Sequence, residues 1–180
     1  MNWLPFAKHK QSPHYDGRPQ ACEIDLLVIH NISLPAGCFG TSYVEDLFMG
    51  TLDCDADPTF SDLAGVRVSA HCVIRRDGSI TQYVPFGERA WHAGVSQWQG
   101  RTRCNDFAIG IEMEGTDTTP YTEAQYTSLV KTTRWLQQYY PKLTNDRIVG
   151  HSDIAPGRKT DPGAAFDWQY YFTLLTNQES

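Results

Sequence analysis

Residues 23–32 read EIDLLVIHNI, which is the strongest fold signal in the chain. This near-continuous apolar run, rich in β-branched residues, predicts a strand inside a sheet that is covered on both faces. His30 stands at the carboxyl end of the predicted strand, where ligands gather in open α/β sheets. Taken alone, the strand leaves two roles open for His30, a ligand-binding residue or a satisfied structural histidine.

A second strand is predicted by the alternation in FAIGIEME, residues 107–114. Its large apolar side chains point to one side, whereas Gly110, Glu112 and Glu114 point to the other. Because burying unpaired carboxylates is costly, we expect that second side to line a polar cleft. Gly110 would leave room there for a close approach. Alternation does not distinguish Glu112 from Glu114 as the functional carboxylate.

Local signals predict the remaining elements. Asp77-Gly78 between two apolar runs predicts a β-hairpin with a two-residue turn over residues 66–85. Thr122 and Gln125 form a capping box for a long helix over 122–140. We also expect a short helix at 43–48, a short strand at 147–150, and a last helix that Asp167 caps.

Three stretches are predicted to lack strong regular structure. Residues 1–22 are expected to form an irregular N-terminal arm. The long connection 33–65 is expected to form one wall of the cleft. The loop 88–105 carries Trp91, His92 and Trp98, which would either wall a ligand site or pack on the sheet.

HSDIAPGRKTDPG, residues 151–163, predicts a turn rather than a helix, because it is built around a Pro-Gly pair. Asp161 precedes a proline, which pushes its backbone toward an extended conformation. Lys159 and Asp161 are then expected to project to the same side. A plain surface turn with a solvated lysine is the alternative for this loop taken alone.

His30, His151 and Asp161 together offer two imidazoles and one carboxylate. That set leaves an open position on Zn²⁺, as in catalytic rather than closed structural sites. Zinc lowers the pKa of a bound water to roughly 7. Glu112 or Glu114 could move protons, and Lys159, beside Asp161, could hydrogen-bond a developing oxyanion. These groups suffice for metal-assisted amide hydrolysis.

Length and charge exclude several classes of protein. The chain has 180 residues, which favours one domain spanning 1–180. Its formal net charge of −6 offers no basic excess to neutralise phosphates, so we expect no nucleic-acid partner. No stretch approaches the roughly 18 apolar residues of a membrane span, and MNWLPFAKHK lacks the apolar run of a signal peptide. We therefore expect a protein without membrane association.

The five cysteines are scattered, odd in number and without a CxxC pair. A disulfide framework or a cysteine zinc ribbon is not expected from this pattern. Free thiols fit a reducing compartment, so we expect a cytoplasmic protein.

Five stretches together resemble one known family, the zinc-dependent N-acetylmuramoyl-L-alanine amidases, which share their fold with peptidoglycan recognition proteins. The resemblance covers nearly the whole chain and is strongest to cytosolic members that act in bacterial cell-wall recycling. The stretches are VIHNIS, SAHCVIRRDGSITQYVP, AWHAGVS, CNDFAIGIEMEG and GHSDIAPGRKTDPG.

The resemblance implies a mixed α+β fold, with a central mixed β-sheet flanked by helices. It implies one Zn²⁺ on His30, His151 and Asp161, and it selects Glu112, with Lys159, as the catalytic pair. The implied reaction cuts the amide between the lactyl group of 1,6-anhydro-N-acetylmuramic acid and L-alanine in small soluble muropeptides. No protein partner is implied.

Four further residues are expected to contact the muropeptide. The resemblance suggests Asn31, Arg67 and Arg103, and guanidinium groups suit the carboxylates of a stem peptide. His71 lies in the first strand of the predicted hairpin, where it either faces the cleft, as we expect, or is a core histidine.

Two other functions compete with the amidase. The first is a non-catalytic muropeptide-binding module on the same fold, which the retention of all five key residues disfavours. The second is a Cys/His hydrolase that uses Cys72 or Cys104, for which no triad signature is present.

Overall fold

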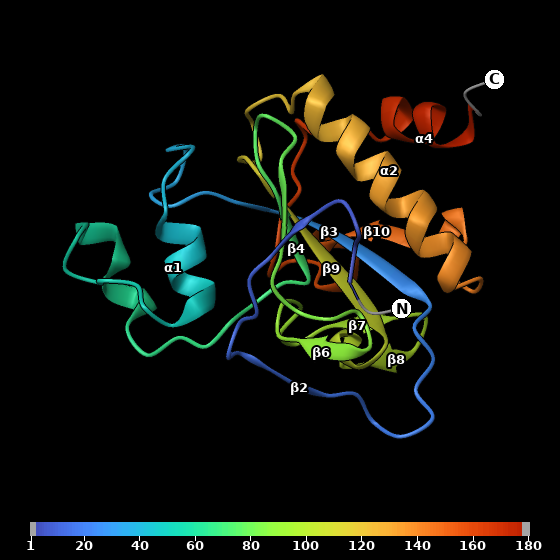
Figure 1. Ribbon diagram of the computed structural model, residues 1–180, viewed down its shortest axis with the longest axis horizontal. Coiled ribbons are helices and arrows are strands. Elements are labelled where there is room, and N and C mark those ends of the chain that lie inside the picture. The colour runs from blue at the N-terminus through green and yellow to red at the C-terminus, as the bar shows by residue number, and fades with distance from the viewer. Residues whose placement is uncertain (1–2, 178–180) are drawn as a thin grey trace.

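The structure is a computed structural model that describes residues 3–177, and its centre is a six-stranded mixed sheet (Figure 1). The strand order is β1-β5-β4-β9-β3-β10. β5 runs antiparallel to β4, whereas β4, β9, β3 and β10 are parallel to one another. In that order the strands span Lys8–His9, Ile80–Gln82, Cys72–Ile74, Ala108–Glu114, Leu26–Ile32 and Ile148–Gly150. The mixed sheet confirms the expected fold class.

Two small antiparallel ribbons and several helices complete the described part of the chain. The ribbons pair β2 (Tyr15–Gly17) with β6 (Glu88–Ala90), and β7 (Gln97–Trp98) with β8 (Arg101–Thr102). The α-helices are α1 (Tyr43–Met49), α2 (Glu123–Tyr139), α3 (His151–Ile154) and α4 (Trp168–Thr176). Short 3-10 helices span Pro58–Leu63 (η1), Cys104–Asp106 (η2) and Asn145–Arg147 (η3). Among residues 3–177, no helix combines the length and apolar character that crossing a bilayer requires.

β3 is an interior strand with apolar contacts on both faces, as its sequence predicts. Leu27 and Ile29 belong to the larger core cluster, whereas Leu26 and Val28 belong to a second cluster on the other face. The strand pairs with β9 in a parallel register that sets His30 beside Glu112. Neighbouring residues in register point to the same face, so the two side chains share one side of the sheet.

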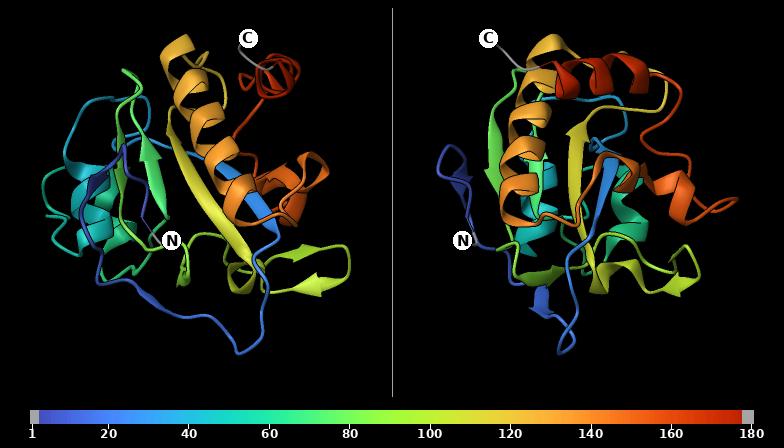
Figure 2. Two further views of the ribbon diagram at one scale, coloured as in Figure 1. Left: turned by 45° about the vertical axis from the view of Figure 1, so that its right-hand side comes forward. Right: turned by 90° about the vertical axis from the view of Figure 1, so that its right-hand side faces the viewer.

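The two faces of the sheet have different covers. α2 and α4 pack together over the face on which Ile109, Ile111 and Met113 are buried (Figures 1 and 2). On the opposite face α1 packs on Val73 in one cluster, and α3 packs on Val28 in another. His30 and Glu112 emerge on this second face.

The long helix begins where the sequence predicts. The Thr122 side chain accepts a hydrogen bond from the backbone of Gln125, and the Gln125 side chain accepts one from the backbone of Thr122. Tyr121 and Tyr126 contact each other across this start, with ring centroids 6.3 Å apart. The capping box and the helix are therefore confirmed.

Three local predictions are wrong. Residues 3–22 are not wholly irregular, because β1 pairs with β5 and β2 pairs with β6. The hairpin exists, but Arg75 pairs with Ser79 and leaves a three-residue loop in which Gly78 has a φ of 83°. Residues 151–163 start with one helical turn, α3, before the predicted loop.

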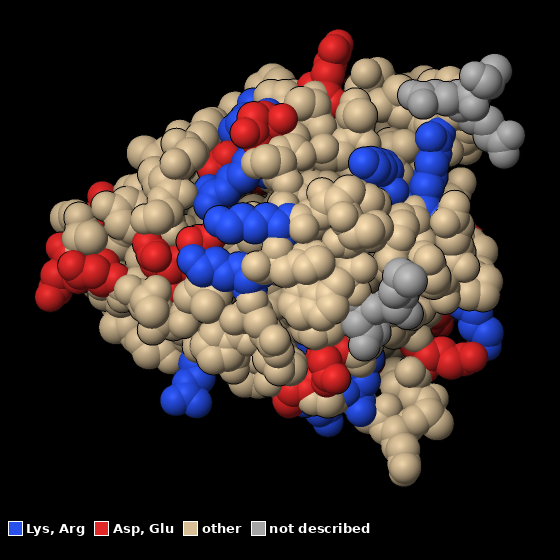
Figure 3. Space-filling view, viewed as in Figure 1, with Lys and Arg blue, Asp and Glu red and all other residues tan. Residues whose placement is uncertain are grey.

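The connection 33–65 contributes part of the cleft wall and also carries η1, which was not predicted. Figure 3 shows acidic side chains gathered at the left end of one face, over the region that holds η1 in Figure 1. The acidic run 53–57 belongs to this connection, and none of its residues lines the cleft.

Candidate metal centre and catalytic cleft

A cleft of about 670 Å³ opens on the sheet face that carries His30 and Glu112. Its walls come from the segment after β3, from α1, from the loop before β7, from the loop after β9 and from the segment 158–161. These pieces are far apart in sequence. The carboxyl ends of the parallel strands β3, β9 and β10 bring them together, as expected for an α/β sheet.

Three side-chain atoms converge at the floor of the cleft. Nδ1 of His30 lies 3.0 Å from Nδ1 of His151, and both nitrogens lie 3.1 Å from Oδ2 of Asp161. A tetrahedral ion with bonds of about 2.0–2.1 Å holds its ligand atoms about 3.3 Å apart. The three atoms of His30, His151 and Asp161, called the triangle below, are therefore close to the spacing that such an ion requires. These residues are the group of His, Cys, Asp and Glu side chains in the described chain that could hold a metal ion. The structure thus brings together the three residues that the sequence pointed to.

The contact of the second ring nitrogen of His151 indicates which tautomer the ring adopts. Nε2 of His151 lies 3.1 Å from the carbonyl oxygen of Ala93. Since a carbonyl can only accept, Nε2 carries the proton and Nδ1 keeps its lone pair for the centre of the triangle. His30 has a comparable contact, because its Nε2 lies 2.8 Å from Nδ1 of His92.

Electrostatics favour a neutral imidazole at His30 beside an ionised carboxylate at Asp161. Burial lowers the pKa of His30 to about 4, although the hydrogen bond with Asp161 opposes this shift. Burial would raise the pKa of Asp161, but its hydrogen bonds with His151 and His30 outweigh burial and hold that pKa below its usual range. Two neutral nitrogens and one carboxylate are the protonation states that metal ligation requires.

Glu112 stands beside this triangle as a buried carboxylate with an unused oxygen. Its Oε2 has no hydrogen-bond partner among residues 3–177. Burial and the negative charge of Asp161 raise the pKa of Glu112 well above its ordinary value, and the charge of Lys159 opposes them. A carboxylate with a raised pKa is a stronger base, which suits a group that accepts and returns a proton.

Glu114 lies two residues further along the same face and is fully engaged. Its carboxylate accepts hydrogen bonds from Nη1 of Arg75 at 2.8 Å, from the backbone of Arg76 at 3.1 Å and from the backbone of Gly40 at 2.7 Å. Glu114 therefore anchors the connection 33–65 to β9 and does not line the cleft.

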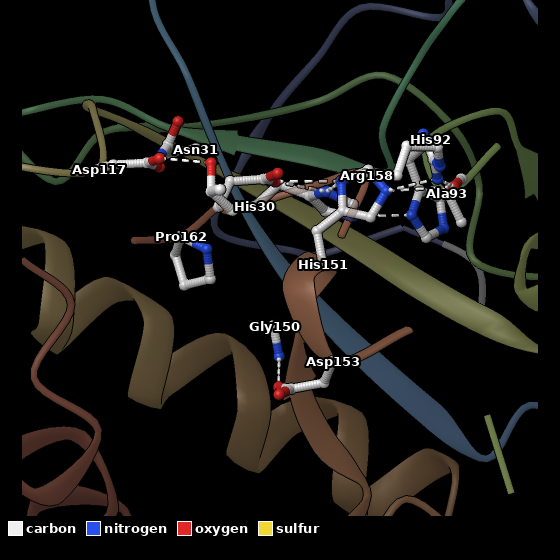
Figure 4. A network of polar contacts seen from close by, with 12 residues as sticks. His30, Asn31, His92, Ala93, Asp117, Gly150, His151, Asp153, Arg158 and Pro162 are labelled. Atoms are coloured by element: carbon white, nitrogen blue, oxygen red, sulfur yellow. Dashed lines mark hydrogen bonds and ion pairs between the residues drawn. The ribbon is translucent and has the colours of Figure 1, made fainter. Parts of the chain in front are cut away.

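The other side of the cleft carries Lys159 and Asn31. Lys159 lines the cleft together with Asp161, in agreement with the predicted common direction of the two side chains. Nδ2 of Asn31 donates to Oδ1 of Asp117 at 2.8 Å (Figure 4). Oγ1 of Thr160 donates to Oδ2 of Asp117 at 2.5 Å. Asp117 thus ties the residue after His30 to the residue before Asp161.

His71 is not where a substrate-binding residue would be. Its side chain is fully buried, its Nδ1 accepts a hydrogen bond from the backbone of Gly110 at 3.0 Å, and its Nε2 lies 3.1 Å from the carbonyl oxygen of Glu88. The structure therefore corrects this expectation: His71 is a core histidine, the alternative that the sequence had left open.

The two arginines expected at the muropeptide lie outside the cleft wall. Arg67 is exposed and borders a smaller pocket, although the next residue, Val68, lines the cleft. Arg103 borders a neighbouring groove, and Arg158 lines both that groove and the cleft.

Neither candidate thiol is suited to nucleophilic catalysis. Cys72 is buried in β4, and Cys104 is buried at the start of η2. Burial raises the pKa of both thiols, which disfavours the reactive thiolate. Neither residue lines the cleft.

Sequence reasoning missed two residues next to the triangle. Asp117 follows the carboxyl end of β9, the same sheet edge as His30, and that position was an available signal. His92 was recognised only as a cleft aromatic. Its contact with His30 joins residues 62 positions apart, and no spacing in the sequence indicates it.

Proteins with similar sequences are amidases, which agrees with the hydrolytic chemistry that this site could support. The family model described as N-acetylmuramoyl-L-alanine amidase matches residues 20–164. The 1,6-anhydro-N-acetylmuramyl-L-alanine amidase AmpD of Enterobacter cloacae is 60% identical over 174 residues, which cover 97% of this chain and 92% of the relative.

Solved structures agree as well. A crystal structure of a selenomethionine derivative of AmpD superposes with a TM-score of 0.94 at 57% identity and covers 97% of each chain. The amidase AmiD of E. coli, in complex with the substrate anhydro-N-acetylmuramic acid-L-Ala-D-gamma-Glu-L-Lys, superposes with a TM-score of 0.61 at 31% identity. That match covers 87% of this chain and 60% of AmiD. The chain therefore belongs to the N-acetylmuramoyl-L-alanine amidase family, and it is an amidase hydrolase.

Proposed function

We propose that this amidase uses one Zn²⁺ to hydrolyse the amide between the lactyl group of 1,6-anhydro-N-acetylmuramic acid and L-alanine of a muropeptide. The observation that carries the proposal is the triangle of His30, His151 and Asp161 beside the unpartnered carboxylate of Glu112. The substrate is that of relatives matched along nearly their whole length, whose name specifies the 1,6-anhydro sugar.

Zinc fits the three donors better than calcium or magnesium would. Two imidazole nitrogens and one carboxylate oxygen are ligands that zinc accepts, whereas calcium and magnesium prefer sites made of oxygen. His30, His151 and Asp161 would hold the ion with three protein ligands, the number found in catalytic rather than closed structural zinc sites. When bound, zinc lowers the pKa of a coordinated water to about 7 and polarises a carbonyl oxygen.

In this proposal Glu112 is the catalytic acid and base. Its free Oε2 accepts a proton from the attacking water and then delivers it to the nitrogen of L-alanine as the amide breaks. Burial supports the role, because it makes the Glu112 carboxylate more basic than an exposed one.

Lys159 and Asn31 act on the substrate in the same proposal. The Lys159 ammonium hydrogen-bonds the carbonyl oxygen of the scissile amide as that oxygen gains negative charge. Asp117 accepts from Nδ2 of Asn31, so the Oδ1 of Asn31 remains available to accept from a substrate N–H. Arg103 borders a groove that Arg158 connects to the cleft, and with Arg67 it is proposed to meet the stem-peptide carboxylates.

The cytoplasm is the proposed location. All five cysteines are free, and free thiols fit a reducing compartment. A soluble muropeptide inside the cell would then reach the cleft directly.

The other function that the sequence left open, a non-catalytic muropeptide-binding module, is disfavoured by the match to the amidase family. A binding module has no need of a buried carboxylate with a raised pKa. Burying that carboxylate costs free energy of folding, and the cost brings no gain in affinity for the ligand. Mass spectrometry of the anhydro-muropeptide after incubation with zinc-loaded protein separates the two functions. Release of the free peptide supports the amidase, whereas an intact but bound muropeptide supports the binding module. A parallel incubation with the non-anhydro muropeptide tests the sugar preference.

A further inference from the structure

Both histidines of the triangle direct their second ring nitrogen at the same dipeptide, His92-Ala93. Nε2 of His30 lies 2.8 Å from Nδ1 of His92, and Nε2 of His151 lies 3.1 Å from the carbonyl oxygen of Ala93. The dipeptide lies in the loop between β6 and β7, and Figure 4 shows it on one side of the two histidines. One short segment therefore sets the orientation of two rings that come from different elements, β3 and α3.

The hydrogen-bond chemistry gives the dipeptide an acceptor role toward both rings. Each histidine must keep a lone pair on Nδ1 to ligate a metal, so each must carry its proton on Nε2. With the rings in those tautomers, the Ala93 carbonyl accepts from Nε2 of His151, and Nδ1 of His92 would accept from Nε2 of His30. A donor in place of His92 Nδ1 would favour the wrong tautomer of His30.

The dipeptide is itself held by the side chain of Asn105. Oδ1 of Asn105 accepts hydrogen bonds from the backbone nitrogen of His92 at 3.1 Å and from that of Ala93 at 2.8 Å. Nη2 of Arg158 also donates to the Ala93 carbonyl, at 2.7 Å. A single amide oxygen thus fixes the backbone of both residues that contact the histidines.

The sheet leaves a defined space for the His92 ring. A Cβ atom on Gly110 would lie 2.4 Å from Cγ and 2.5 Å from Nδ1 of His92. Contacts so short cannot form, so a glycine is required in β9 for the ring to rest on the strand. The close approach that the sequence predicted at Gly110 is made by His92.

We propose that His92 and Asn105 are positioning residues for the metal centre. His92 orients the ring of His30 and selects its tautomer, and Asn105 holds the dipeptide that contacts both histidines. This role rests on the proposed zinc site. Partners of this kind commonly change metal affinity by about 10- to 100-fold when they are removed.

The test measures zinc dissociation constants by competition with a chelator of known affinity. His92→Leu and Asn105→Leu remove the acceptors, whereas His92→Asn and Asn105→Asp keep an oxygen in nearly the same place. We expect the leucine variants to bind zinc about 10- to 100-fold more weakly. The acceptor-keeping variants should recover most of that loss. His9→Leu is the matched control, because it removes a ring hydrogen bond to the Leu4 carbonyl outside the cleft.

The outcomes separate the possible failures. Leucine variants that bind zinc as tightly as the unmodified protein would overturn the positioning role. Equal losses in the leucine and acceptor-keeping variants would also overturn it, because packing alone would then explain them. Circular dichroism identifies a variant that does not fold, and the Asn105 pair then tests the role independently of the His92 pair. Unmodified protein that binds no zinc would instead refute the proposed function.

Discussion

Glu112 and Glu114 lie two residues apart on one face of β9, yet their surroundings are opposite. Glu114 is held by three hydrogen bonds from Arg75, Arg76 and Gly40. Glu112 has an oxygen without a partner among the described residues and lines the cleft. The position of each carboxylate along the strand, not its residue type, separates the catalytic candidate from the structural one.

The first prediction contrasts the two carboxylates. Glu112→Gln should keep zinc and lower kcat by about 100-fold or more, because an amide cannot shuttle the proton. Glu114→Gln should lower the free energy of unfolding by about 3 kcal/mol, since it removes the negative charge that is paired with Arg75. Its kcat, per folded molecule, should remain within about threefold of the unmodified value. Steady-state kinetics and urea unfolding measure both effects, and the reverse pattern would reassign the roles.

The second prediction concerns metal-free protein and pH. The unfolded chain gives Glu112 a pKa of about 4.3, and the fold raises that pKa, through burial first and the charge of Asp161 second. Above the raised pKa the folded state holds a costly buried charge, whereas below about pH 4 the carboxyl is protonated in both states. Glu112→Gln should therefore raise the Tm of metal-free protein at pH 7–8, and the gain should disappear toward pH 4. A gain that is independent of pH would show that ionisation of Glu112 is not its source.

The third prediction isolates Lys159. Lys159→Met keeps much of the side-chain volume but removes the ammonium that would stabilise the oxyanion. We expect kcat to fall by about 100-fold while zinc content is unchanged. Lys142→Met is the control, because Lys142 pairs with Glu23 on the surface. Kinetics near the unmodified rate for the Lys159 variant would remove this residue from the catalytic pair.

The fourth prediction concerns Asp117, which contacts both Asn31 and Thr160. Asp117→Ala frees the Asn31 amide to rotate and loosens the segment next to Asp161. A hydrogen bond to a charged group is worth about 1.5–3 kcal/mol. Because a loss of about 1.4 kcal/mol is tenfold, we expect kcat/KM to fall by about 10-fold or more. The control Asp146→Ala removes an acceptor for a nearby threonine hydroxyl at an exposed site. A fall in the control of equal size would indicate a general loss of stability.

Strong periodic patterns in the sequence predicted the elements that position the site. The apolar run of β3, the alternation of β9 and the capping box of α2 each specify a long element through many residues at once. The alternation also predicted that Gly110 and Glu112 share a face. Such patterns can be recognised in the sequence because every second residue of a strand points to the same face of the sheet and so meets the same environment.

Several short elements were beyond this kind of inference, although the short helix α1 and the short strand β10 were predicted. β1 and β2 have two and three residues, and each forms only by pairing with a strand more than 70 positions away. The single turn of α3 lies in a segment whose Pro and Gly favour a loop. His71 could be placed on either side of its strand from sequence, and only the packed structure puts its two nitrogens against Gly110 and Glu88.

The fifth prediction concerns the dependence of hydrolysis on zinc. Protein stripped of metal by a chelator, and the same protein after one equivalent of zinc is returned, are incubated with anhydro-muropeptide and analysed by mass spectrometry. We expect no free peptide from the stripped protein and full release after zinc is restored. His30→Ala, which removes one of the three donors, should not be rescued by that zinc. Undiminished peptide release by the stripped protein would show that zinc is not required for hydrolysis.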